Sequence, residues 1–96
     1  MNYRNRQLLD LAHHLPCQWC GQGVASEPAH SNHQRHGKGM GIKAHDAYFA
    51  ALCHSCHAEL DQGSRWTREE RANIWQSAHD RTMLELWRRG WIRVNR

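Results

Sequence analysis

The spacing of hydrophobic and polar residues changes several times along the chain, and each change predicts a different element. Over residues 2–15 the apolar side chains recur at steps of three and four, which is typical of one face of a helix, and Pro16 predicts its end. Residues 24–29 alternate weakly and predict a short strand, in which Pro28 requires an unpaired position. Residues 47–52 are almost entirely apolar and predict a buried strand.

The second predicted strand is apolar on both faces and leads into a short helix. Alternation places Tyr48, Ala50 and Leu52 on one side of the strand and Phe49 and Ala51 on the other. Residues 55–61 then predict a helix that ends at Gly63. Because His57 and Asp61 are four residues apart, they share one face of that helix.

A long helix is predicted in the last third of the chain. Thr67 and Glu70 form a capping box at its start, and the pattern continues to Arg89, with Gly90 as the C-cap. Its inner stripe is predicted to comprise Ile74, Trp75, Ala78, Thr82 and Leu86, with Trp66 and Trp91 at the ends. Residues 91–94 predict a short terminal strand.

The four cysteines of the chain form two matched pairs. Two residues separate Cys17 from Cys20 and Cys53 from Cys56, and 32 residues lie between the pairs. Four thiolates at this spacing suit one tetrahedral Zn²⁺, because each short turn supplies two ligands with little strain. The alternatives are a redox or disulfide pair, or a different metal ion. We expect a structural zinc that joins the two pairs.

The composition predicts one small domain whose core needs a cross-link. Only 14 of the 96 residues are Leu, Ile, Val or Phe. Five tryptophans and a bound metal can compensate, since zinc binding contributes directly to the folding free energy of small domains. We predict a single zinc-stapled α+β domain over residues 1–96, with an N-terminal helix at 1–16, a core at 17–63 and a C-terminal helix and strand at 64–96.

Basic residues outnumber acidic ones, thirteen to nine, which gives a net charge of +4 and a pI of about 9.2. This excess favours a polyanionic partner such as DNA, although ordinary solvated charge is the alternative. The longest apolar run, residues 47–53, is too short to span a bilayer, and no apolar leader segment follows the basic N-terminus. With thiols better explained by metal than by disulfides, we expect a cytoplasmic protein without a membrane partner.

A flexible basic loop is predicted between the two strands. Glycine occupies every second position over residues 37–41, with Lys38 and Lys43 close by. Backbone amides of such a loop can approach phosphates closely, and we expect Lys38, Lys43 and the nearby Arg35 to bind nucleic acid. The alternative is a mobile hairpin tip that only aids solubility. Two further histidines of this segment are expected to be solvated, namely His33 and His36.

A further pattern combines the cysteine pairs with two histidines. The tripeptide Ala29-His30-Ser31 ends the first strand, and His57 follows Cys56 directly. Together with the loop and the apolar strand, these features resemble the HNH endonucleases of the His-Me finger (ββα-metal) group. Ala-His-Ser-Asn before a Gly-Lys-Gly loop, an Asp before the strand, and Cys-x-x-Cys-His-x-x-x-Asp are similar to small phage and prophage proteins related to the RecA-dependent nuclease Ref. The resemblance covers residues 17 to about 63.

The resemblance implies a hairpin and a helix that clasp one catalytic divalent ion, Mg²⁺ or Mn²⁺, separate from the zinc. His30 corresponds to the general base and His57 to a metal ligand on the helix. A neutral imidazole suits the base because its pKa lies near 6.5. A cation offsets the charge that grows on the phosphate and on the leaving oxygen. Asp46 is the first candidate to complete the ligand set, with Asp61 and Asn32 next.

Two positions depart from the usual HNH pattern. Ala29 stands where many of these enzymes carry an Asp or His ligand, and Tyr48 stands where asparagine is usual. The predicted function is a metal-dependent DNA endonuclease, encoded by a phage or prophage, that serves recombination and has a recombinase as a further partner. The alternative is a non-catalytic zinc module that binds nucleic acid or a phage or host protein.

Overall fold

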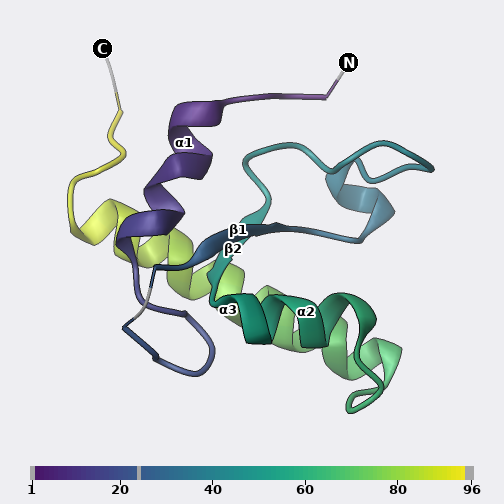
Figure 1. Cartoon of the computed structure of the whole chain (residues 1–96). Coiled ribbons are helices and arrows are strands. Elements are labelled where there is room, and N and C mark those ends of the chain that lie inside the picture. Colours follow the sequence, from purple (N-terminus) through teal and green to yellow (C-terminus); the bar gives the residue numbers. More distant parts are fainter. Residues whose placement is uncertain (1, 24, 95–96) are drawn as a thin grey trace.

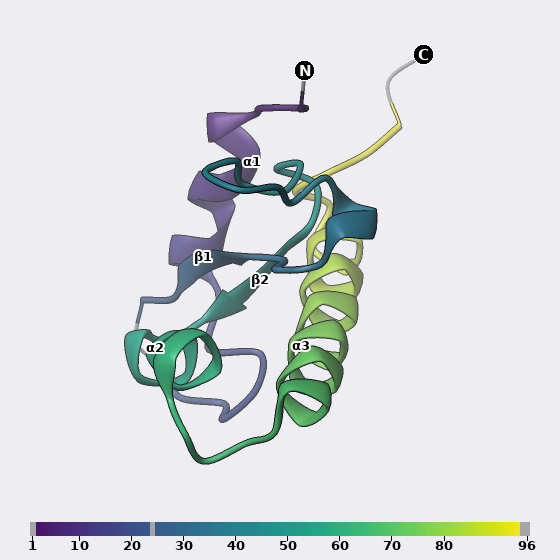
Figure 2. The same cartoon turned by 90° about the vertical axis from the view of Figure 1, so that its right-hand side faces the viewer.

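The computed structural model describes residues 2–23 and 25–94. It contains helices and one two-stranded sheet, so the chain has the predicted α+β architecture (Figure 1). In chain order the elements are α1 (Arg6–Asp10), the 3₁₀ helix η1 (Leu11–His14), β1 (Glu27–His30), the 3₁₀ helix η2 (Gln34–His36), β2 (Phe49–Leu52), α2 (His54–Gln62) and α3 (Arg68–Arg88). The helices α1 and α3 lie on opposite sides of the paired strands (Figure 2).

The strands β1 and β2 pair in antiparallel fashion. Glu27 lies opposite Leu52 at one end of the sheet, and His30 lies opposite Phe49 at the other. The first strand therefore begins three residues later than predicted. Val24, where the prediction started, lies outside the described residues.

Pro28 occupies a place in the sheet where its missing N–H costs no ladder hydrogen bond. It lies opposite Ala51, whose backbone groups bond elsewhere. The Ala51 N–H donates to Thr82 Oγ1 (2.9 Å), and the Ala51 carbonyl accepts the backbone N–H of Gln18 (2.9 Å). The proline thus takes the unpaired position that the sequence requires.

Both faces of β2 are buried, as the alternation predicts. The first core cluster comprises Cys17, Ala29, Ala50, Leu52, Cys53, Leu60, Ile74, Trp75 and Ala78, with Tyr48, Cys56 and Trp66 packed against it. The second comprises Ala12, Leu15, Phe49, Ala51 and Leu86. The strand β2 therefore contributes alternate side chains to two cores, one against α2 and the first half of α3, and one against the N-terminal helical segment and the last turns of α3.

The helix α3 begins with the predicted capping box. Thr67 Oγ1 accepts the N–H of Glu70 (3.1 Å), and the Glu70 carboxylate accepts the N–H of Thr67 (2.9 Å). Its predicted inner stripe is buried. The indole N–H of Trp75 donates to the carbonyl of Ala29 (2.8 Å), which ties α3 to β1. Neither α3 nor any other described helix is long and apolar enough to cross a membrane.

The terminal strand predicted over residues 91–94 is wrong. Gly90 has a φ of +72°, and the N–H groups of Trp91 and Ile92 donate back to the carbonyl of Leu86 (3.0 and 3.4 Å). These hydrogen bonds complete the C-terminal end of α3, so the chain turns back onto the helix there. Trp91 belongs to neither core cluster and is 38% exposed.

The N-terminal helix starts later than predicted, at Arg6. Asn5 is its N-cap, because the Asn5 side chain accepts the N–H of Leu8 (3.0 Å). The preceding residues are extended along the segment before β2, where the Asp46 N–H donates to the Tyr3 carbonyl (2.9 Å). Hydrogen-bond partners this distant in the sequence do not alter helical periodicity. The periodicity therefore predicted a helix that starts too early.

Candidate functional site

The four cysteines meet between the turn after η1 and the first turn of α2. Their Sγ atoms all lie within 4.8 Å of one another, and those of Cys20 and Cys53 are 3.8 Å apart. A tetrahedral ion with metal–sulfur bonds of about 2.3 Å separates its ligands by about 3.8 Å. The cluster can therefore hold a metal ion such as zinc.

Backbone N–H groups donate hydrogen bonds to one sulfur in each half of this cluster. The N–H of Cys20 donates to Cys17 Sγ, and the N–H of Cys56 donates to Cys53 Sγ, each over 3.5 Å. The second contact makes Cys53 the N-cap of α2, whose positive end favours a thiolate. Gly21 has a φ of +81°, which the first turn needs and other residues rarely adopt.

The thiols of the cluster differ in acidity. Burial opposes ionisation of Cys17, but N–H donors from Cys53, Cys20 and Trp19 outweigh it and lower the pKa of Cys17 to about 7. Burial and the neighbouring thiols raise the pKa of Cys56. Full deprotonation of four adjacent thiols thus requires a cation to balance the charge. Within residues 2–23 and 25–94, no other group of three or more His, Cys, Asp or Glu side chains converges this closely.

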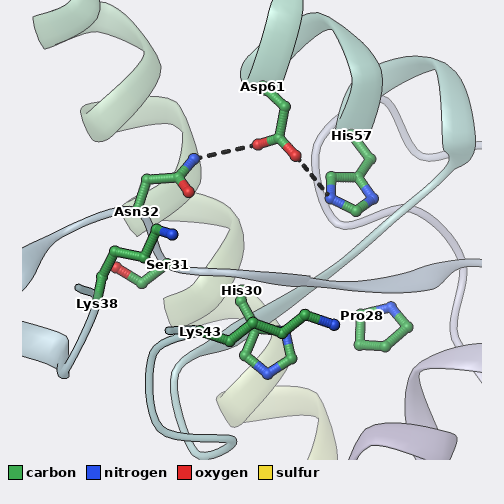
Figure 3. A pocket seen from close by; sticks show the side chains of 8 residues that line it. All are labelled: Pro28, His30, Ser31, Asn32, Lys38, Lys43, His57 and Asp61. Atoms are coloured by element: carbon green, nitrogen blue, oxygen red, sulfur yellow. Dashed lines mark hydrogen bonds and ion pairs between the residues drawn. The ribbon is translucent and has the colours of Figure 1, made fainter. Parts of the chain in front are cut away.

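A separate pocket of about 280 Å³ brings together the two histidines that the sequence singled out. His30 reaches it from the end of β1, and His57 and Asp61 reach it from α2 (Figure 3). The complete lining is Pro28, His30, Ser31, Asn32, Lys38, Lys43, His57 and Asp61. Two lysines and two histidines against a single carboxylate suit an anionic ligand.

His30 is held by Asp46 rather than by a residue of the pocket. The His30 Nε2–H donates to Asp46 Oδ1 (2.8 Å), because an ionised carboxylate only accepts. This places the proton on Nε2 and leaves the lone pair on Nδ1. The imidazole is therefore fixed in one tautomer, in which Nδ1 is the remaining hydrogen-bond acceptor.

Asp46 was predicted to be a metal ligand, but the structure shows it engaged in hydrogen bonds within the protein. It is buried, with 3% of its surface exposed, and it also accepts from the backbone N–H of Asn5 (2.6 Å) and from Arg4 Nη1 (3.2 Å). Burial tends to raise its pKa, but the hydrogen bonds from His30 and Asn5 and the Arg4 charge lower it. With both oxygens engaged and no share in the pocket wall, Asp46 orients His30, and the contacts do not favour it as a metal ligand.

His57 lies between two carboxylates. Its Nδ1 is 2.6 Å from Glu27 Oε1, and its Nε2 is 3.2 Å from Asp61 Oδ2, so the expected pairing along one face of α2 is present. Asp61 also accepts from Asn32 Nδ2 (3.1 Å). The hydrogen bond to Asp61 raises the pKa of His57, burial opposes this, and Glu27 adds to the increase.

Glu27 and Arg4 are site residues that the sequence did not reveal. Glu27 lies opposite Leu52, the residue before Cys53, so the strand register brings it beside the first turn of α2. Its position follows only once the register is known. Arg4 reaches Asp46 from the extended N-terminal segment that was predicted to be helical.

A groove of about 770 Å³ continues from the pocket toward α3. The two hollows share Ser31, Asn32, Lys38, His57 and Asp61. The groove adds Arg35, Arg68 and Arg71 to its rim, and Trp75 and Met40 to its apolar lining. Asp61 is the one acidic residue in either wall. The predicted contacts of nucleic acid, Arg35, Lys38 and Lys43, therefore lie along one basic surface.

His36, which was expected to be solvated, is buried beside this groove, with 8% of its surface exposed. Its Nε2 accepts from Arg35 Nε (3.3 Å), so its Nδ1–H donates to Ser31 Oγ (2.6 Å). The ring stacks on Tyr48 with centroids 4.2 Å apart. Burial, followed by the charge of Arg35, lowers the pKa of His36. Tyr48, where the resemblance to HNH endonucleases would lead one to expect asparagine, packs against His36 and the first core cluster.

These observations define a small α+β protein with a four-cysteine cluster suited to metal and a basic pocket lined by histidines. A family model described as "Protein of unknown function (DUF968)" matches residues 1–84, and the chain belongs to this family. No curated protein and no solved structure gives a significant match to the chain.

Proposed function

We propose that this protein is a metal-dependent DNA endonuclease that hydrolyses phosphodiester bonds in the pocket between β1 and α2. In this proposal β1, β2 and α2 form a ββα-metal (HNH-type) centre. The observation that carries it is that His30, with its tautomer set by Asp46, shares one pocket with the His57–Asp61 pair.

His30 acts as the general base. Its Nε2–H is engaged by Asp46, so Nδ1 accepts the proton of the attacking water. The buried carboxylate also stabilises the imidazolium that results, because its own pKa is lowered and it remains ionised. His30 and Asp46 therefore suffice for proton abstraction, and no other titratable residue of the pocket wall takes part in that step.

His57 and Asp61 hold the divalent ion, Mg²⁺ or Mn²⁺. When the His57 Nδ1–H donates to Glu27, the Nε2 lone pair and Asp61 Oδ2, which are 3.2 Å apart, are two neighbouring acceptors that would serve as ligands of a cation. Two protein ligands are typical of sites that share the ion with substrate phosphate and water. The ion supplies Lewis acidity to the phosphate and offsets charge on the leaving oxygen. Asp61 thus takes the place that was predicted for Asp46.

The cysteine cluster holds a structural Zn²⁺ that positions this centre. His57 follows Cys56 directly, so an ion that binds Cys53 and Cys56 sets the start of α2 and, with it, the place of the His57 side chain. The basic rim of pocket and groove binds the DNA backbone. From the resemblance to Ref-related phage and prophage proteins, we further propose that the nuclease serves recombination with a recombinase as its partner.

The test is plasmid cleavage by zinc-loaded protein with added Mg²⁺ or Mn²⁺. Replacing the general base in His30→Ala should lower the nicking rate by roughly 10²- to 10⁴-fold. Asp46→Asn, which no longer fixes the tautomer, should lower it by up to about 10⁴-fold. His14→Ala is the matched control, because His14 lines neither hollow. Equal rates for wild type and His30→Ala, or no cleavage by wild type with any metal, would overturn the proposal.

One observation favours the alternative of a non-catalytic zinc module that binds nucleic acid or a protein. Within the described part of the chain, only the four cysteines converge as a ready-made metal group, whereas His57 and Asp61 offer two ligands. This alternative expects salt-sensitive DNA binding that His30→Ala leaves unchanged, together with one bound metal ion per chain. Metal titration of the protein with and without substrate separates the two functions.

A further inference from the structure

An exposed apolar turn lies at the end of the loop between β1 and β2. In this turn, residues 39–42, Gly39 and Ile42 exchange two backbone hydrogen bonds of 3.1 Å each, and Gly41 has a φ of +68°. Met40 is fully exposed, and 52% of the Ile42 surface is exposed. Residues 39–42 form the apolar tip of this loop.

The loop that carries the apolar tip is held firmly at its base. Asn2 Nδ2 donates to the carbonyls of Gly37 (2.7 Å) and Lys43 (2.9 Å), on the two sides of the tip. Arg4 donates to the carbonyls of Lys43 (2.8 Å) and Ala44 (2.6 Å). The extended N-terminal segment thus binds the loop on both sides of the tip. These hydrogen bonds hold the tip in one arrangement rather than as a freely moving turn.

Two lysines and the proposed active-site pocket lie directly beside the apolar tip. Lys38 precedes the tip and Lys43 follows it, and both line the pocket that contains His30 and His57. Met40 itself lines the adjoining groove. A polyanion bound by Lys38 and Lys43 would therefore lie beside the tip and close to Met40.

We propose that the apolar tip is a wedge for duplex DNA, in which Met40, supported by Ile42, inserts between neighbouring base pairs while Lys38 and Lys43 bind the flanking phosphates. The inference rests on the proposed function in taking DNA as the substrate class. Unbranched or branched aliphatic side chains that enter a base step unstack and kink the duplex. The cost is smallest at flexible, mismatched or bulged steps, so the wedge directs the pocket to deformed duplex.

Two other occupants of the apolar tip fit the observations less well. A single-stranded ligand is normally bound by aromatic faces on which bases stack, and the tip has none. A protein partner normally buries a larger apolar patch than two side chains, with charged residues depleted at its centre. Here the two apolar side chains lie between two lysines. The lysines can bind the negatively charged phosphates on the two sides of an inserted side chain.

The test measures binding to two duplexes by fluorescence anisotropy, with zinc-loaded protein and without added Mg²⁺ or Mn²⁺, so that no cleavage is needed. The duplexes have the same length, and one carries a two-nucleotide bulge. Wild type should bind the bulged duplex about tenfold more tightly. Met40→Ala should bind both alike, whereas Met40→Leu should keep the preference. Met40 is fully exposed, so these substitutions leave the core intact.

Lys38→Ala is the matched control, because it should weaken binding to both duplexes equally. Equal binding of the two duplexes by wild type, or a preference that Met40→Ala retains, overturns the wedge. Tighter binding of single-stranded DNA than of either duplex also overturns it. Absence of all DNA binding overturns both the wedge and the proposed function. Loss of cleavage alone, with the Met40-dependent preference retained, overturns only the catalytic proposal.

Discussion

At the scale of single residues, chemical role depends on which partner each side chain meets. His30 and His36 lie six residues apart in one segment, yet one faces the pocket and bonds to a carboxylate, whereas the other is buried between Ser31 and Tyr48. The first donates its Nε2–H to an ionised carboxylate. The second has Arg35 as its neighbour, and burial and that charge disfavour protonation.

The buried His36 predicts a specific pH dependence of stability. Its pKa in the folded chain lies below the usual value of 6.5, mainly because of burial and then because of Arg35, His33 and His79. The unfolded chain therefore binds a proton more readily, so this contribution to stability is complete above about pH 6.5 and decreases as the pH falls below it. In His36→Phe, which retains the stack on Tyr48, this part of the decrease should disappear.

The measurement is the urea midpoint of both proteins at pH 7.5 and pH 5.5 with saturating zinc. His36→Phe loses hydrogen bonds to Ser31 and Arg35, so it should be less stable at pH 7.5. Its midpoint should nevertheless change less between the two pH values than that of wild type. A change as large as in wild type would show that His36 does not titrate on unfolding. Acid release of zinc affects both proteins and cancels in the comparison.

At the scale of elements, the two helices near the site depend on different sources of stability. The helix α3 has 21 residues, a complete capping box and a buried stripe. The helix α2 has nine residues and one buried side chain, Leu60, and helices of this length are marginal in water on their own. Its start at Cys53 must therefore be held by the cysteine cluster and by Glu27 across the sheet.

The variant Cys53→Ser tests the stabilisation by the metal separately from that by the helix cap. Serine is a good N-cap, so the start of α2 keeps its local hydrogen bond, but the cluster loses one of four thiolates. Structural zinc contributes about 10–16 kcal/mol in small domains, which is comparable with the whole stability of a domain. We expect the variant to bind zinc weakly and to lose its near-ultraviolet circular dichroism.

Zinc content and circular dichroism measure this outcome. Ser55→Ala, next to the cluster but without a thiol, is the control and should retain one zinc per chain. A Cys53→Ser protein that folds normally without zinc would show that apolar packing alone supports the fold.

At the scale of the whole molecule, the hairpin lies between two cores, and basic side chains gather along the pocket and the groove. Five basic side chains line the pocket and the groove, namely Arg35, Lys38, Lys43, Arg68 and Arg71. Among the described residues, none of the five pairs with a carboxylate, whereas Arg4, Arg88 and Arg89 do. The net charge of +4 is thus distributed so that positive charge remains available beside His30 and His57.

This distribution predicts the salt dependence of DNA binding. Each phosphate contact contributes about 0.9 to the slope of log affinity against log salt concentration for duplex DNA. The double variant Lys38→Ala/Lys43→Ala should therefore reduce the magnitude of the slope by about 2. Arg6→Ala, an exposed change on α1 outside both hollows, should leave it unchanged. Equal slopes for the double variant and wild type would place the DNA on another face. The measurement is a titration at four or more salt concentrations.

Local patterns explain which parts of the fold were predictable. The capping box of Thr67 and Glu70 lies within four residues, and the two faces of β2 follow from simple alternation. By contrast, the helix start at Arg6 and the absence of a strand at 91–94 depend on competing hydrogen bonds, in the first case to residues about forty positions away. Neither competitor changes the periodicity of the segment itself.

The sequence by itself determined the α+β class and the cysteine pairs that can share a metal, because local periodicity and the short spacing within each pair carry this information. The expectation for His30 and His57 came from the resemblance to HNH endonucleases, and the structure places both histidines in one pocket. Only the tertiary structure decided that Asp46 bonds to His30, that Glu27 contacts His57 and that His36 is buried. These contacts join residues up to 30 positions apart, and they arise from strand register and loop closure. A carboxylate in a sequence has no preferred partner until the chain brings one within hydrogen-bonding distance.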